Sequence, residues 1–94
     1  MFLRVSILFA LTAFVTPATA CAVTADGYSS LREGDSYRSA VSKLGCDGEE
    51  ISRSSVAGYT TVMYMWNGSG LGANMNAMFQ NDRLVSKSQF GLTR

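Results

Sequence analysis

The chain has 94 residues, enough for one domain, and its eight basic and seven acidic side chains leave a formal net charge of +1. This balance argues against a basic face for nucleic acid. The chain has no histidine, which excludes histidine-based nucleophile pairs, general bases and metal ligands.

The first twenty residues are expected to be a secretory signal peptide. Arg4 gives a basic start, residues 5–15 form an apolar run, and residues 18–20 read Ala-Thr-Ala, an A-x-A cleavage site. The apolar run is shorter than the about 20 residues that a membrane-spanning helix needs. We therefore predict a periplasmic or secreted protein whose single mature domain is residues 21–94.

Two cysteines, Cys21 and Cys46, leave two interpretations open. In an oxidising compartment they can pair, which would tie the N-terminus to the body and add on the order of 3 kcal/mol. Alternatively, Cys21 follows the cleavage site directly and carries lipid, which would anchor the protein in the outer membrane. Two cysteines without histidine cannot build a structural zinc shell, so neither a metal nor another cofactor is expected.

Two short helices are predicted ahead of the sheet. Residues 28–31 can form one helical turn that Gly34 ends. A clearer helix begins after Ser36, a favourable N-cap, and ends at Gly45, which suits the left-handed stop. Its apolar residues recur at helical spacing and must cover a sheet face: Tyr37, Ala40, Val41 and Leu44.

Four extended segments follow, separated by short turns, and predict an antiparallel sheet of three or four strands. They are a weak first strand at 51–56, a central strand at 59–66, an alternating strand at 73–80 and a return strand at 83–90. Residues 67–72 are rich in glycine and form a hairpin loop. The expected fold class is therefore α+β, with two N-terminal helices packed on this sheet.

The register of the last hairpin follows from its two-residue turn. Such a turn places Phe79 opposite Leu84 and Ala73 opposite Phe90. We prefer this register because a shift by one residue would bury Lys87. The alternation then directs four residues at the helices: Ala73, Met75, Ala77 and Phe79.

Several short patterns together resemble a known superfamily. They are Gly34-x-Ser36-x-x-x-x-Val41, Tyr64-x-Trp66 and Ser86-Lys87-Ser88-Gln89. Over residues 28–92 the chain resembles the superfamily of the bacterial β-lactamase inhibitory protein and the outer-membrane lipoprotein SmpA/OmlA. The resemblance implies a helix–loop–helix on an antiparallel sheet. Asp35 stands where the family usually has Met, and the chain holds one copy of the domain, so no inhibitor contact residues are carried over.

The expected function is that of an exported, non-enzymatic protein-binding module of the bacterial cell envelope in the SmpA/OmlA manner. The alternative is a secreted or periplasmic inhibitor of an enzyme such as a β-lactamase. The expected partner is an envelope protein, not nucleic acid, and membrane contact would come only through lipid on Cys21. No catalytic residues are expected.

Candidate binding residues lie at the end of the central strand and in its loop: Tyr64, Trp66, Gly68, Gly70 and Leu71. For Tyr64 and Trp66, packing in the core is the alternative interpretation. Four methionines can form an adaptable binding surface or fill the core: Met63, Met65, Met75 and Met78.

Overall fold

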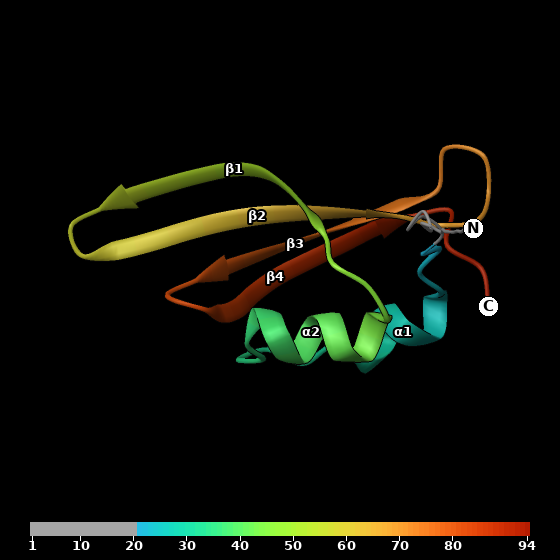
Figure 1. Cartoon of the computed structure of the whole chain (residues 1–94), viewed down its shortest axis with the longest axis horizontal. Coiled ribbons are helices and arrows are strands. Elements are labelled where there is room, and N and C mark those ends of the chain that lie inside the picture. Colours follow the sequence, from blue (N-terminus) through green and yellow to red (C-terminus); the bar gives the residue numbers. More distant parts are fainter. Residues whose placement is uncertain (1–20) are drawn as a thin grey trace, which may run out of the picture.

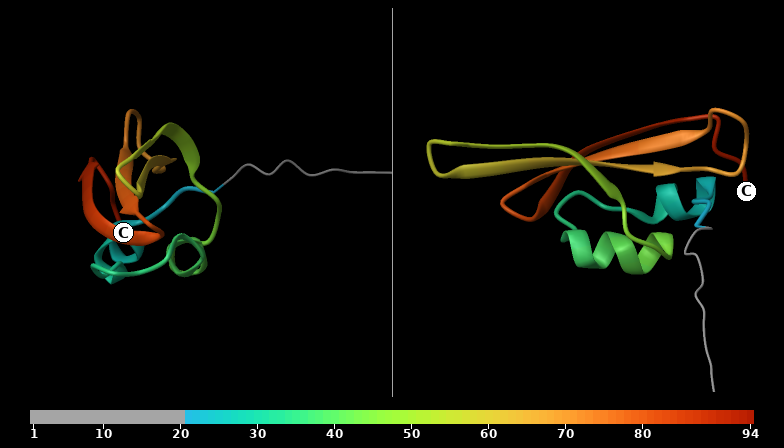
Figure 2. Two further views of the ribbon diagram at one scale, coloured as in Figure 1. Left: turned by 90° about the vertical axis from the view of Figure 1, so that its left-hand side faces the viewer. Right: turned by 45° about the horizontal axis from the view of Figure 1, so that its top comes forward.

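The structure, a computed structural model, describes residues 21–94, so the signal peptide expected at residues 1–20 lies outside the described residues. Two helices precede four strands: α1 (Ala25–Ser30), α2 (Tyr37–Leu44), β1 (Glu49–Val56), β2 (Tyr59–Asn67), β3 (Asn74–Gln80) and β4 (Arg83–Phe90). The strands form one antiparallel sheet in the order β1-β2-β3-β4. Both helices lie on the same side of this sheet (Figures 1 and 2). The expected α+β class is confirmed.

Helix α2 forms where the apolar spacing predicts it. The Ser36 hydroxyl accepts the N–H of the third helical residue at 3.1 Å, and Gly45 ends the helix in the left-handed conformation with φ 96°. A second acceptor comes from the turn between β3 and β4, where Asp82 Oδ1 receives the N–H of Tyr37 at 3.0 Å. The apolar stripe packs under the sheet through its two buried members, Ala40 and Leu44.

Helix α1 begins and ends earlier than predicted. The Thr24 hydroxyl accepts the N–H of Gly27 at 3.0 Å, so Thr24 caps the helix. The helix ends at Ser30, because Leu31 turns to an extended conformation and is buried. Gly34, the predicted end, lies in the following loop. The early start was missed because Thr24 is followed by Ala-Asp-Gly, a combination that is also typical of turns.

The core lies between the helices and the sheet. Strand β3 alternates between buried and half-buried residues along its length, as predicted. Neighbouring strands and the N-terminal segment complete this layer. Its buried members include Val23, Leu31, Val62, Trp66, Ala73, Met75, Ala77, Phe79 and Leu84.

The predicted register between β3 and β4 is wrong beyond its first pair. Phe79 pairs with Leu84 as predicted, but the next pair is Met78 with Ser86. Val85 is therefore an extra residue that forms a β-bulge in β4. A bulge of one residue moves every later side chain of the strand to the opposite face.

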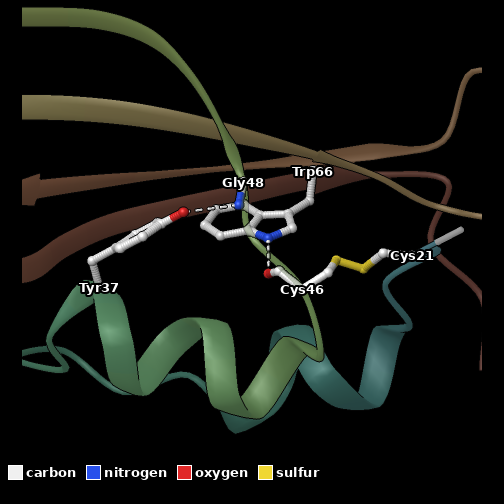
Figure 3. Close-up of a disulfide and its surroundings, with 5 residues drawn as sticks. All are labelled: Cys21, Tyr37, Cys46, Gly48 and Trp66. Atoms are coloured by element: carbon white, nitrogen blue, oxygen red, sulfur yellow. Dashed lines mark hydrogen bonds between the residues drawn. A yellow bond between two sulfur atoms is a disulfide. The ribbon is translucent and has the colours of Figure 1, made fainter. Parts of the chain in front are cut away.

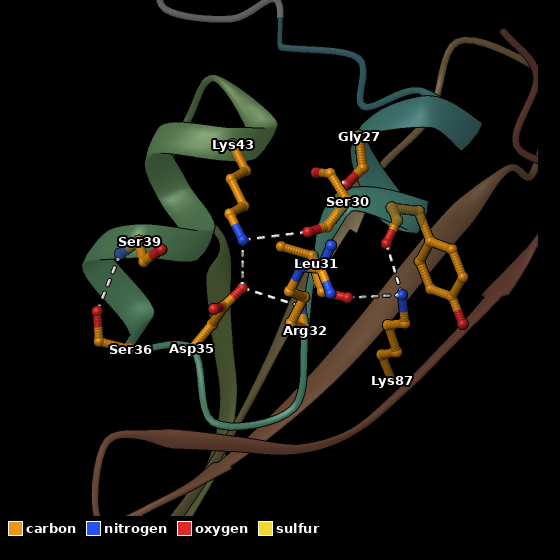
Figure 4. A network of polar contacts seen from close by, with 10 residues as sticks. Gly27, Ser30, Leu31, Arg32, Asp35, Ser36, Ser39, Lys43 and Lys87 are labelled. Atoms are coloured by element: carbon orange, nitrogen blue, oxygen red, sulfur yellow. Dashed lines mark hydrogen bonds and ion pairs between the residues drawn. The ribbon is translucent and has the colours of Figure 1, made fainter.

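The bulge brings a lysine under the sheet. Lys87 stands on the helix-facing side, and its ammonium group donates to the carbonyl oxygens of Tyr28 at 2.7 Å and Leu31 at 3.1 Å (Figure 4). It also lies 4.3 Å from the centre of the Tyr28 ring. Phe90, which was predicted to face the helices, pairs with Asn74 on the other face and is exposed.

The β1–β2 hairpin extends beyond the rest of the sheet. Its turn lies at Ala57 and Gly58, as predicted, and both residues have positive φ, 54° and 86°. Every residue of β1 is exposed, and Val56 and Tyr59 present apolar side chains near the tip. Figure 1 shows this hairpin reaching past the β3–β4 turn and past both helices.

Candidate protein-binding face

Two of the predicted binding residues belong to the packed side of the sheet. Trp66 is only 3% exposed, and its indole Nε1 donates to the carbonyl oxygen of Cys46 at 2.9 Å (Figure 3). Gly48 packs on the indole ring so closely that a Cβ there would lie 2.7 Å from it. Tyr64 is half-buried and stacks on Tyr37, with ring centres 4.1 Å apart. These contacts place both residues in the core layer, the alternative that the sequence had left open.

Tyr37 links helix α2 to this aromatic layer. Its hydroxyl oxygen accepts the N–H of Gly48 at 3.0 Å (Figure 3). Burial raises the pKa of Tyr37 above its ordinary value of 10, and the hydrogen bond from Gly48 acts in the opposite direction. The hydroxyl is therefore neutral at physiological pH and serves as a structural hydrogen-bonding group.

Cys21 and Cys46 form a disulfide with a Cα–Cα distance of 5.8 Å (Figure 3). The structure thus has the disulfide, which is one of the two alternatives predicted for Cys21, the other being a lipid. A lipid on Cys21 would be linked through the same sulfur atom, so the two fates exclude each other in one molecule. The disulfide lies beside the Cys46 carbonyl that receives Trp66, at the packed side of the sheet.

The loop between β2 and β3 contributes the other three predicted binding residues, which have different environments. At Gly68 a Cβ would lie 2.6 Å from the end of the Leu92 side chain, and a parallel bridge joins Gly68 to Val23, so Gly68 lies in a crowded, partly buried position. Gly70 is exposed, and Leu71 is fully exposed. The loop surrounds a shallow hollow of about 650 Å³ that also includes Met65 and Asn74. Gly70 and Leu71 are therefore accessible to a partner.

The side of the sheet opposite the helices, here called the open face, is covered by no element within residues 21–94 (Figure 2). At its centre Met63 pairs with Met78 across β2 and β3, and Met65 follows on the same face of β2. All three methionines are half-buried. Around them lie small or uncharged polar side chains: Ser52, Ser54, Thr61, Asn74, Asn76, Gln80, Ser86 and Ser88.

Charged groups lie at the ends of the open face rather than at its centre. Glu49 pairs with Met65 at one end, and Arg83 pairs with Gln80 at the other. The ion pair between Arg53 and Glu50, with an N–O distance of 2.9 Å, lies toward the helix side. The Arg53 guanidinium lowers the pKa of the Glu50 carboxyl through its hydrogen bonds. The open face therefore offers a neutral contact area.

Both outer strands of the sheet interrupt their own pairing. In β1 the register shifts at Ile51, and in β4 it shifts at Val85. β-Bulges and charged side chains on edge strands discourage the addition of a further strand. Glu50 and Arg53 on β1 and Lys87 on β4 supply those charges. The two edges of the sheet are thus unfavourable places for the addition of a further strand.

Two side chains that hold the helices against the sheet could not be predicted from the sequence. Asp82 caps α2 across 45 positions of the chain, and Lys87 holds α1 across more than 50. Both contacts join residues far apart in the sequence, and no local pattern predicts them.

Among residues 21–94 no group of three or more Cys, Asp or Glu side chains is placed to hold a metal ion. What the open face offers is a largely neutral surface with three half-buried methionines at its centre.

The two helices and the four-stranded antiparallel sheet define a small α+β domain. The model of the family Beta-lactamase inhibitor (BLIP) matches residues 24–94, and the chain belongs to this family. The match covers both helices and all four strands. The resemblance to SmpA/OmlA lipoproteins stays a prediction. The comparisons with curated proteins and with solved structures gave no match. Within residues 21–94 no helix is long and apolar enough to cross a membrane.

Proposed function

We propose that this protein is an exported, non-enzymatic module that binds another protein on its open face and with the adjoining β2–β3 loop. The observation that carries the proposal is the row of half-buried methionines, Met63, Met65 and Met78, on a sheet face that nothing within residues 21–94 covers. Methionine side chains are flexible and polarisable, and they adapt to varied partner surfaces. Membership of an inhibitor family supports the same assignment.

The chemistry of the open face indicates what kind of contact it makes. The Met63–Met78 pair at its centre has only uncharged cross-strand neighbours, and a single carboxylate, that of Glu49, lies beside Met65. Coulomb attraction therefore contributes little to the binding free energy. Salt shortens the Debye length to about 3 Å at 1 M and weakens charge-driven complexes. Binding through this face should therefore survive high salt, unlike binding through the ends at Glu49 or Arg83.

The proposal is tested by capture from envelope extract with matched variants. Met78→Glu places a carboxylate at the centre of the open face, and Ser42→Glu places one on the exposed side of α2 as a control. We expect the same partner with wild type and Ser42→Glu, at low and high salt, and its loss with Met78→Glu. Circular dichroism should show that both variants are folded. Retention of the partner by folded Met78→Glu would overturn the proposed surface.

A second function, inhibition of an enzyme such as a β-lactamase, is favoured by the family match alone. It predicts inhibition at sub-micromolar concentration, with the exposed Leu71 in the contact. Inhibition assays against several β-lactamases would test it, with Leu71→Glu expected to weaken any inhibition by more than tenfold. Absence of inhibition across such a panel would remove this candidate and leave the envelope-binding role.

For localisation, we propose a periplasmic or secreted protein without a lipid anchor. The disulfide supports this, because Cys21 has one sulfur atom and Cys46 engages it. An outer-membrane lipoprotein of the SmpA/OmlA kind would require that sulfur for its lipid. The two outcomes are separated by the intact mass of the mature protein.

A further inference from the structure

The methionines of the open face have a second property that does not depend on any protein partner. Met63 and Met78 are directly opposite each other on neighbouring strands. Side chains in such a pair have Cβ atoms about 4.5–5.5 Å apart. Met65 lies two residues beyond Met63 on the same face, about 7 Å along the strand. Because each side chain has three rotatable bonds, the three thioether sulfurs can converge on one point above the sheet.

Residues 21–94 offer few other soft ligands for a transition metal. The chain has no histidine, and both of its thiols are joined in the Cys21–Cys46 disulfide. Met75, the remaining methionine of residues 21–94, is fully buried in the core on the opposite side of the sheet. The accessible soft donors of the domain are therefore gathered at this one place.

The donor type decides the metal. Thioethers are soft and neutral, and soft sulfur ligands select Cu(I), whereas carboxylates and imidazoles suit harder ions and Cu(II). Thioethers also need no deprotonation, and they persist in an oxidising compartment where free thiols pair. We propose that Met63, Met65 and Met78 form a three-thioether site for Cu(I). The carboxylate of Glu49, which pairs with Met65, adds a favourable negative charge beside it.

The site is tested on the mature, disulfide-intact protein by anaerobic titration with Cu(I), supplied as its acetonitrile complex, in competition with a chromophoric Cu(I) chelator. We expect one Cu(I) per chain, with no binding of Zn²⁺ or Cu²⁺ at the same site. The ε-methyl NMR signals of Met63, Met65 and Met78 should shift together. The signal of Met75 provides an internal control and should not shift.

Variants separate a specific site from general attraction to sulfur. Met63→Leu with Met78→Leu removes two ligands at similar volume, and we expect a loss of affinity beyond the ~10–100-fold that an outer-shell change costs. Met75→Leu leaves the site intact and should bind as wild type does. The proposal would be overturned if wild type removed no more Cu(I) from the chelator than the double variant does. It would also be overturned if the methyl signals of Met63, Met65 and Met78 did not shift. The assay contains no protein partner, so its outcome is independent of the proposed function.

Discussion

Phe79 belongs to the aromatic layer between the sheet and the helices. It is 2% exposed, and its ring meets the edges or faces of Tyr37 and Tyr64 in T-shaped contacts with centres 5.8 Å apart. Replacement of a buried Phe by Ala costs about 3–5 kcal/mol, and a small domain has only about 5–15 kcal/mol in total. So small a domain lies at the low end of this range, where the loss is comparable to the total, and we therefore predict that Phe79→Ala is largely unfolded. Urea denaturation followed by Trp66 fluorescence would measure the loss.

A matched control exists one strand away. Phe90 is 69% exposed, and Phe90→Ala should change the free energy of unfolding by no more than about 0.5 kcal/mol. If Phe79→Ala prevents measurement, Phe79→Leu retains most of the apolar volume and should give a smaller, measurable loss. Equal losses at positions 79 and 90 would contradict the assignment of the packed face.

Asp35 predicts a local pH dependence. Its Oδ2 accepts from Lys43 Nζ at 2.8 Å and from the backbone N–H of Arg32 at 2.9 Å (Figure 4). The Lys43 hydrogen bond, followed by that of Arg32, lowers the pKa of Asp35 from its ordinary value of 3.8. The unfolded chain therefore binds the proton more readily. The contribution of Asp35 to stability is present above this ordinary value and is lost as the pH falls through the folded pKa.

The measurement is a carbon-detected NMR titration of the Asp35 carboxyl. We expect a midpoint below 3.8, and Asp35→Asn should lose less stability than wild type as the pH falls through this range. Glu50 titrates in the same direction because of Arg53, so the signal must be resolved by residue. A midpoint at or above the ordinary value would show that the contact with Lys43 is absent in solution.

At the scale of the elements, α1 depends on β4. The helix has six residues, which is too short to be stable in isolation. Lys87 donates two hydrogen bonds to the carbonyl groups at its end (Figure 4). Hydrogen bonds to a charged group are worth about 1.5–3 kcal/mol each. We predict that Lys87→Met speeds amide exchange in α1 while the amides of β2 and β3 keep their protection.

Ser88→Met is the control for this exchange experiment. It places the same side chain one residue further along β4, on the open face, where it touches neither helix. Amide exchange in α1 should match wild type. If amide exchange in Lys87→Met were faster throughout the sheet as well, Lys87 would stabilise the whole domain rather than α1 alone.

The same strand shows where sequence reasoning stops. Apolar spacing predicted α2 and the buried residues of β3 because each element presents one regular apolar stripe. It could not predict the bulge at Val85. The residues before and after Val85 do not alternate regularly between polar and apolar, so the sequence does not show where the extra residue lies. The assumption that Lys87 would avoid the helix-facing side then fixed the wrong register. The carbonyl groups that receive Lys87 come from the other end of the chain.

The candidate site was only partly predictable for a related reason. Strand β2 carries apolar residues on both faces, and nothing local says which face the helices cover. Trp66 and Tyr64 could therefore lie at the surface or, as the favoured alternative, in the core. The exposure of the loop residues Gly70 and Leu71, in contrast, follows from the glycine-rich composition. Met63, Met65 and Met78 were recognised as candidates, but only the sheet order separates them from the buried Met75.

At the scale of the whole molecule, the N-terminal segment is attached at several points. Val23 N–H bonds to Asn67 O at 3.0 Å, and Ala25 N–H bonds to Thr93 O at 3.0 Å, so the segment joins the end of β2 to the C-terminus. The Cys21–Cys46 disulfide adds a covalent link to the end of α2 across 25 positions. The segment therefore closes one end of the domain.

Closing a loop of this length stabilises a protein by about 3–4 kcal/mol, chiefly by restricting the unfolded chain. We predict that Cys21→Ser with Cys46→Ser lowers the free energy of unfolding by that amount. A reductant should lower the urea midpoint of the wild type and leave the double variant unchanged. The intact mass of protein from the native envelope should be lighter by one pair of hydrogen atoms than the reduced mature chain. A membrane-bound species heavier by a diacylglyceryl group and an acyl chain would instead establish a lipoprotein, in which Cys46 carries a free thiol and the N-terminal segment is held by its hydrogen bonds alone.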